Sequence, residues 1–158
     1  MNRECLQERF APSSICYGCG PANEQGLKLR SVVDGNSVVA TWTPKPYHHA
    51  FAGVLNGGVI STILDCHSNW TGAYSLMTKA GDDKPPPTVS ASILVEFLKP
   101  TPMQVVSLEG RASEISGRKV VVESMLSAAG QVTATLRGTF VAVGPDHPAS
   151  RRWSGERS

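Results

Sequence analysis

Hydrophobic residues recur at helical spacing in one long stretch of the chain, residues 57–78. Apolar side chains fall three and four positions apart from Val59 to Met77, which is the period of a helix with one buried face. Glycine, aspartates and three prolines follow over residues 81–87, and such residues end helices. The pattern predicts one helix, about 33 Å long, over residues 57–78.

The other apolar segments alternate with polar residues or are rich in valine, as strands are. Two short strands are predicted before the helix and four after it, at residues 27–33, 37–43, 88–98, 105–115, 119–127 and 132–143. Turn residues separate successive strands, for example Asp34-Gly35-Asn36 and Ser116-Gly117, so antiparallel hairpins are expected. The order predicts an α+β fold in which an antiparallel sheet wraps one central helix.

The 158 residues correspond to a single domain. We expect an irregular N-terminal segment over residues 1–26, the folded domain over 27–143 and a disordered tail over 144–158. Charged residues make up only 18% of the chain, below the usual level of about 25%. Between Gly58 and Thr78 the only charged residue is Asp65. We therefore expect the helix to be buried on one side by the sheet and on the other by a second subunit.

Asp65 and the start of the helix form the candidate catalytic site. Gly57 and Gly58 stand at the helix N-terminus, where unpaired backbone N–H groups and the helix dipole favour a developing oxyanion. A carboxylate about two turns later could act on an acyl group held there. The alternative is structural, with Asp65 bonded to Ser61, Thr62 or Asn69.

Two longer stretches strengthen the catalytic interpretation. The segment Gly53-Val-Leu-Asn-Gly-Gly-Val-Ile-Ser-Thr-Ile-Leu-Asp65 and the strand over residues 89–100 resemble hotdog-fold acyl-CoA thioesterases of the phenylacetic-acid-degradation type. Residues 16–29 resemble the N-terminal segment of one subgroup of that family.

The resemblance implies a hotdog dimer, or a tetramer of dimers, that hydrolyses coenzyme A thioesters. Gly57 would donate its N–H to the thioester carbonyl, with Gly58 beside it at the substrate. Asp65 would act as general base or as nucleophile, and Ser90 matches an assisting hydroxyl. We expect a composite site, with Asp65 from one subunit and Ser90 from the other. A non-catalytic acyl-CoA-binding protein and, less favoured, a hydratase or dehydratase are the alternatives.

One residue departs from the family motif, because Asn56 stands where the family has histidine. Asparagine donates a hydrogen bond but carries no proton, so Asn56→His is expected to be tolerated and to keep or raise activity. His49 is a candidate substrate contact, and Arg118 and Lys119 are candidates for the phosphates of coenzyme A. His67 is interpreted as a core or interface histidine.

The remaining features exclude other classes. The net charge of +2 gives no indication of nucleic-acid binding, and no apolar stretch has the length of a membrane span. No secretion signal is visible, so a cytoplasmic location is expected. Cys16-x-x-Cys19 supplies only half of a zinc site, so we expect a turn with buried reduced thiols, with no metal and no cofactor.

Overall fold

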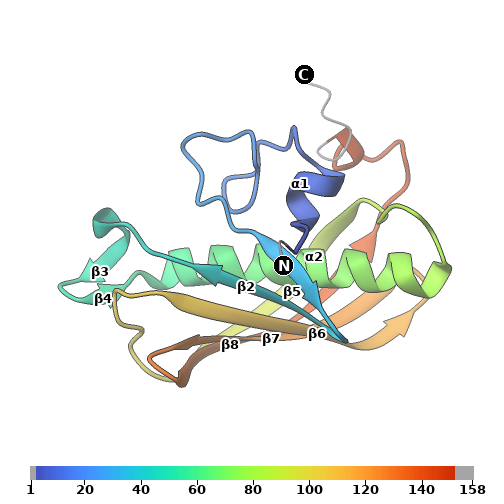
Figure 1. Cartoon of the computed structure of the whole chain (residues 1–158). Helices are drawn as coiled ribbons and strands as arrows, with labels where there is room; N and C mark the ends of the chain where they lie inside the picture. The colour runs from blue at the N-terminus through green and yellow to red at the C-terminus, as the bar shows by residue number, and fades with distance from the viewer. Residues whose placement is uncertain (1–2, 152–158) are drawn as a thin grey trace.

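The computed structural model describes residues 3–151, and its main element is a six-stranded antiparallel sheet (Figure 1). The strand order is β1-β2-β6-β7-β8-β5. The strands are β1 (Ser31–Asp34), β2 (Ser37–Trp42), β5 (Thr88–Phe97), β6 (Val106–Ser116), β7 (Lys119–Ala128) and β8 (Gln131–Ala142). Each hydrogen-bonded pair is antiparallel, so the α+β prediction is confirmed.

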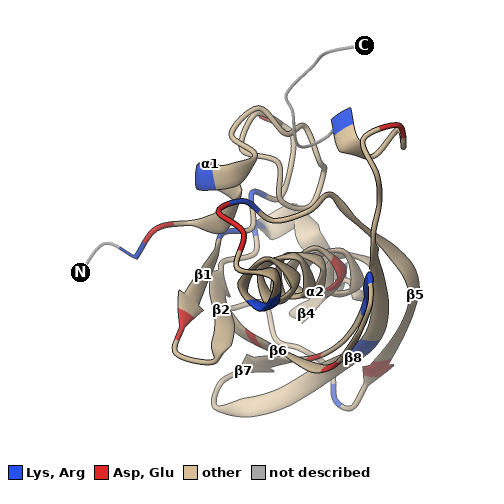
Figure 2. Cartoon of the chain, turned by 90° about the vertical axis from the view of Figure 1, so that its right-hand side faces the viewer, with Lys and Arg blue, Asp and Glu red and all other residues tan. Residues whose placement is uncertain are grey.

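The central helix α2 (Gly57–Ala80) lies in the curve of this sheet, as the view along its axis shows (Figure 2). It ends at Gly81, whose φ of 74° is left-handed and whose N–H donates to the carbonyls of Met77 and Thr78. At Gly72 the helix touches the sheet so closely that a Cβ would lie 2.8 Å from Val120. The core between the two layers is fully buried, with Ile63 and Phe140 both at 0% exposure.

The other side of α2 is covered by the chain's own N-terminal segment. This segment contains the short helix α1 (Leu6–Phe10) and loops that lie across α2 from the sheet (Figures 1 and 2). A Cβ on Gly18 would lie 2.4 Å from Cys66 Sγ, and Leu29 is buried. The expectation that a second subunit covers this side is therefore wrong for the middle of the helix, residues 66–73, which are all buried within one chain.

The first predicted strand is shorter than expected. Strand structure begins at Ser31, not at residue 27, because Lys28 has a left-handed φ of 53° that no strand accommodates. The preceding residues instead pair with the loop, through Leu27 N–H to Tyr17 carbonyl at 2.8 Å and Leu29 N–H to Gly18 carbonyl at 3.0 Å.

Three small elements lead into α2: a 3₁₀ turn at Pro46–His48, β3 (His49–Phe51) and β4 (Val54–Leu55). Of the tail expected over residues 144–158, residues 144–151 form hydrogen-bonded turns, and the remainder lies outside the described residues. In the described part of the chain, no helix combines the length and apolar character needed to cross a bilayer.

His67 is a core residue, as one of its two predicted roles required. It is 0% exposed, and its Nε2 lies 3.0 Å from the Val38 carbonyl and its Nδ1 2.9 Å from Ser31 Oγ. A carbonyl only accepts, so Nε2 carries the proton and Nδ1 accepts from the serine. Ser31 in turn accepts from Gln7 Nε2 at 3.1 Å. This neutral network joins α1, β1, β2 and α2.

Burial lowers the pKa of His67 to about 4, although its bond to Val38 opposes the shift. The unfolded chain, with a pKa near 6.5, therefore binds the proton first as the pH falls. The contribution of His67 to the free energy of unfolding is fully present well above pH 6.5. It should fall by roughly 3 kcal/mol towards pH 4, at about 1.4 kcal/mol per pKa unit.

Urea unfolding in the presence of a chelator, from pH 7.5 to 4, measures this loss. His67→Gln keeps a donor for Val38 but cannot titrate, so it should flatten the curve, while His49→Gln at an exposed position should leave it unchanged. An equally steep curve for His67→Gln would contradict the assignment.

Candidate active site

The start of α2 presents a backbone donor. Asn56 caps the helix, because its Oδ1 accepts from the N–H groups of Gly58 at 2.8 Å and Val59 at 3.2 Å. Ile60 N–H donates to the Asn56 carbonyl at 3.0 Å. Within residues 3–151, Gly57 N–H has no hydrogen-bond partner. One amide group at the positive end of the helix is thus left to bind an acceptor.

Gly57 lines an apolar cavity of about 370 Å³. Its walls come from β3, β4, the first turn of α2 and the segment after β5; they include Phe51, Ile60, Phe97 and Leu98. Lys99 is the cationic residue in this lining, and its Nζ also donates to Gln131 Oε1 at 3.0 Å. Lys99 is not among the site residues predicted from the sequence, although its position directly after the predicted apolar strand, residues 88–98, could have indicated it.

Asp65 is half-buried and accepts a hydrogen bond from Ser90 Oγ at 2.6 Å. Ser90 belongs to β5, pairs with the buried Phe140 of β8 and stands just before a bulge between Ser90 and Ser92. Bulges commonly redirect side chains at active sites. Both residues belong to the same chain, so the expectation that Ser90 comes from the partner subunit is wrong.

The structural alternative for Asp65 involved Ser61, Thr62 and Asn69, and these side chains bond elsewhere. Ser61 and Thr62 donate to the carbonyls of Gly57 and Gly58, each at 2.8 Å. Asn69 Nδ2 donates to the Thr88 carbonyl at 3.0 Å. The carboxylate of Asp65 instead accepts from the hydroxyl of Ser90, a residue that the resemblance had indicated.

The two adjacent histidines play different parts. His48 is buried and stacked on Trp42, with 5.2 Å between ring centroids. Burial lowers its pKa. Its carbonyl accepts from Asn56 N–H at 2.9 Å, so this residue fixes the helix cap. His49 is exposed, and its Nδ1 donates to the Pro46 carbonyl at 2.6 Å.

Arg118 and Lys119 lie at the turn between β6 and β7. Lys119 pairs across the sheet with Val141, beside the start of β5, whereas Gly57 contacts Phe97 at the end of β5. Within one chain these two cations are therefore at the opposite end of the sheet from Gly57. Their role in phosphate binding stays a prediction.

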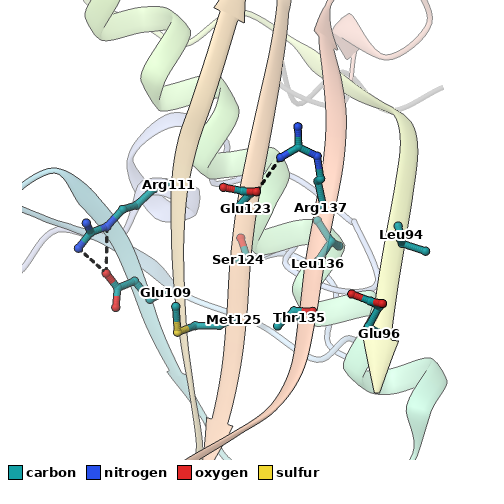
Figure 3. A pocket seen from close by; sticks show the side chains of 10 residues that line it. All are labelled: Leu94, Glu96, Glu109, Arg111, Glu123, Ser124, Met125, Thr135, Leu136 and Arg137. Carbon is teal, nitrogen blue, oxygen red and sulfur yellow. Dashed lines mark hydrogen bonds and ion pairs between the residues drawn. The ribbon is translucent and has the colours of Figure 1, made fainter. Parts of the chain in front are cut away.

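A hollow of about 660 Å³, larger than the cavity beside Gly57, lies on the face of the sheet away from α2 (Figure 3). Two exposed ion pairs line it, Glu109 with Arg111 at 2.7 Å and Glu123 with Arg137 at 2.6 Å. It contains neither Asp65 nor Gly57, so volume alone does not identify the site.

Sequence comparison now gives the family. The model of the thioesterase superfamily matches residues 52–135, which include the capped helix start, Asp65 and Ser90. The chain belongs to the thioesterase superfamily. A thioesterase superfamily protein from Shewanella loihica PV-4 is 34% identical, over 78% of this chain and 98% of that one, with a TM-score of 0.61. No curated protein matches the chain.

More distant structures share the hotdog fold of this thioesterase superfamily member. The E. coli PaaI protein from the phenylacetic acid degradation operon is 15% identical over 75% of this chain and 81% of its own, with a TM-score of 0.61. A Streptococcus mutans UA159 protein, solved with acetyl-CoA bound, is 18% identical over 73% of this chain and 89% of its own, also with a TM-score of 0.61. The predicted PaaI-like hotdog fold is confirmed.

The capping role of Asn56 changes the expected effect of substitutions there. Asn56→His loses an acceptor for two N–H groups, so a loss of about 1 kcal/mol in stability is expected in place of the tolerance predicted from the motif.

Asn56→Asp keeps the cap but adds a negative charge beside Gly57 N–H. It should retain the stability of the wild type and lower acyl-CoA turnover at least about tenfold, since an anion there opposes a developing oxyanion. Thermal unfolding and steady-state kinetics measure the two effects; unchanged turnover in Asn56→Asp would contradict the prediction that Gly57 N–H binds the thioester carbonyl.

Proposed function

We propose that this thioesterase superfamily protein hydrolyses acyl-CoA thioesters to a carboxylic acid and CoA. The observation that carries the proposal is that α2 presents two groups suited to acyl transfer: Gly57 N–H, which has no hydrogen-bond partner within residues 3–151, and the carboxylate of Asp65, which accepts from Ser90 of β5. The apolar cavity beside Gly57 suits an acyl chain, and Lys99 at its lining offers a cation to the CoA phosphates.

In the proposed reaction, Gly57 N–H polarises the thioester carbonyl and stabilises the oxyanion that forms there. Water attacks the carbonyl carbon while Asp65 accepts its proton. Collapse of the tetrahedral intermediate breaks the C–S bond, and the CoA thiolate leaves and is protonated. Direct attack by Asp65, which forms an anhydride that water then opens, uses the same groups.

The distance along α2 bears on how the site is assembled. Gly57 and Asp65 are eight residues apart, which is about 12 Å along a helix axis. Reacting groups must approach to about 3–3.5 Å, and an aspartate side chain does not span the difference. We therefore propose that Asp65 of one chain acts on a carbonyl held by Gly57 of its partner. The proposed site is thus still shared between two subunits, as predicted from the sequence, but the residue that the partner contributes is Gly57 and not Ser90.

The exposed edge of the sheet supports a homodimer. Strand β5 pairs with β8 on one side, and no described strand covers its other side. Leu94, Phe97 and Leu98 on and after this strand are 61%, 56% and 55% exposed. An exposed apolar edge strand offers unpaired backbone groups with which another chain can pair. The proposal includes a homodimer, a possible association of dimers into a tetramer, and a cytoplasmic location.

A panel of acyl-CoA substrates of differing chain length and aromaticity tests the activity, with CoA release followed by a thiol reagent. Turnover that depends on Asp65 supports the proposal. Saturable acyl-CoA binding without CoA release would instead identify a binding protein. Loss of double-bond absorbance from crotonyl-CoA without CoA release would identify a hydratase.

A further inference from the structure

Three cysteine thiols meet between the N-terminal loop and α2, apart from the acyl-transfer groups. The Sγ atoms of Cys16, Cys19 and Cys66 all lie within 4.8 Å of one another, and those of Cys16 and Cys66 are 3.7 Å apart. The sequence showed a pair of possible ligands in Cys16-x-x-Cys19; the fold adds a third from a helix fifty residues away.

The spacing of these sulfur atoms matches a tetrahedral thiolate site. Zinc–sulfur bonds are about 2.3 Å long, so two sulfur ligands on a tetrahedral ion are about 3.8 Å apart. The Sγ atoms of Cys16 and Cys66 are 3.7 Å apart. All three Sγ atoms lie within 4.8 Å of one another, and small side-chain rotations bring sulfur atoms at that distance to the roughly 3.8 Å of a tetrahedral site. A disulfide would require a sulfur separation of about 2 Å.

The loop that carries Cys16 and Cys19 is held in one shape by its backbone. Gly20 N–H donates to the Cys16 carbonyl at 2.8 Å, and a Cβ on Gly20 would lie 2.4 Å from Cys16 N. A Cβ on Gly18 would collide with Cys66 Sγ. Glycines at both positions thus let the two loop thiols approach α2 closely, which orders the ligands before an ion binds.

We propose that Cys16, Cys19 and Cys66 bind one Zn²⁺ ion as thiolates, with water in the fourth position. No other histidine, cysteine or acidic side chain in residues 3–151 joins the group, and the half-buried Cys16 leaves that side accessible to solvent. Each thiol releases its proton as its sulfur bonds to the ion. The ion would pin the N-terminal loop to α2, and this role is independent of the proposed hydrolysis.

The competing use of such thiols is disulfide exchange, which requires an accessible thiolate. Cys66 is buried, and hydrogen bonding to Cys16 and Cys19, together with burial, raises its pKa. Cys19 is buried as well, so two of the three thiols are closed to reagents in solution, whereas coordination removes the proton from a thiol outright.

Metal uptake by the full-length protein tests the proposal. The chain is stripped with a chelator under reducing, anaerobic conditions and titrated with Zn²⁺ against a chromophoric competitor. One equivalent per chain is expected. Substitution with Co²⁺ should give the thiolate charge-transfer and tetrahedral visible bands. Cys66→Ser and the more exposed Cys16→Ser should each bind Zn²⁺ at least about 100-fold more weakly, because even groups outside the ligand shell contribute 10–100-fold.

Cys5→Ser is the matched control, because Cys5 is also buried but donates to Gln7 Oε1 at 3.1 Å outside the cluster. It should bind Zn²⁺ like the wild type. Circular dichroism identifies any variant that fails to fold. If Cys66→Ser does not fold, the Zn²⁺ affinity of the more exposed Cys16→Ser variant tests the proposal. Three results would overturn the proposal: no uptake by the folded wild type, uptake that survives Cys16→Ser and so reflects adventitious surface binding, or a 2 Da mass loss on air oxidation without metal uptake.

Discussion

Asp65→Asn is expected to lower acyl-CoA hydrolysis by about 10²- to 10⁴-fold, the usual contribution of a general base, and to leave the fold intact. The amide has the shape of the carboxylate and can still accept from Ser90, which now donates to Asp65 at 2.6 Å. It can neither take a proton from water nor attack the thioester. Steady-state kinetics and thermal unfolding on the same preparation separate chemistry from stability. A folded Asp65→Asn variant with near-full turnover would show that this carboxylate is structural.

Gly57→Pro is expected to lower turnover by about 10²- to 10³-fold, because it removes the one N–H proposed to bind the oxyanion. Proline is favoured at the first position of a helix. The extended conformation of Asn56, with φ −62° and ψ 130°, is the one that a residue before proline adopts. The new ring would lie close to Phe97, whose atoms are 3.3 Å from a Cβ built on Gly57. Gly57→Ala is the matched control, because it makes a similar contact and retains the N–H.

Refolding the two inactive variants together tests whether the site is shared. In a dimer of Asp65→Asn and Gly57→Pro chains, one of the two sites combines an intact Asp65 with an intact Gly57. About a quarter of the wild-type activity per chain should therefore return in a random mixture of symmetric dimers. Ser90→Ala mixed with Asp65→Asn should give no recovery, because Ser90 and Asp65 belong to the same chain. Absence of recovery in the first mixture, with heterodimers demonstrated, would place Gly57 and Asp65 in one subunit.

Local patterns predicted the elements of the fold with small errors. The helix was expected to end at residue 78 and ends at Ala80, and the four later strands begin and end within about a residue of the prediction. These elements have strong periodicity and glycine or proline at their ends. The prediction for the N-terminal half of the first strand was wrong, because a single left-handed residue, Lys28, redirects the backbone without changing the hydrophobic pattern.

The site could be predicted in part because its motif is local. The spacing from Gly57 to Asp65 follows from helix geometry, and the resemblance indicated Ser90. Periodicity cannot say which chain contributes a side chain, so Ser90 was assigned to the wrong subunit. It also cannot show that Asn56 accepts two backbone bonds, since a capping residue and a substrate-binding residue have the same sequence position. The meeting of Cys16 with Cys66 depends on tertiary contacts alone.

The position of the N-terminal segment on α2 restricts the order in which the protein can fold. Ser31 Oγ, which accepts from Gln7, completes its buried hydrogen bonds at His67, and Gly18 packs against Cys66. On a growing chain, the N-terminal segment can therefore complete its contacts with α2 only after synthesis has passed residue 67 and the helix has a sheet to stabilise it. The earliest part of the described chain is among the last to reach its final place, and until then its buried thiols and leucines are available to other proteins in the cell, chaperones included.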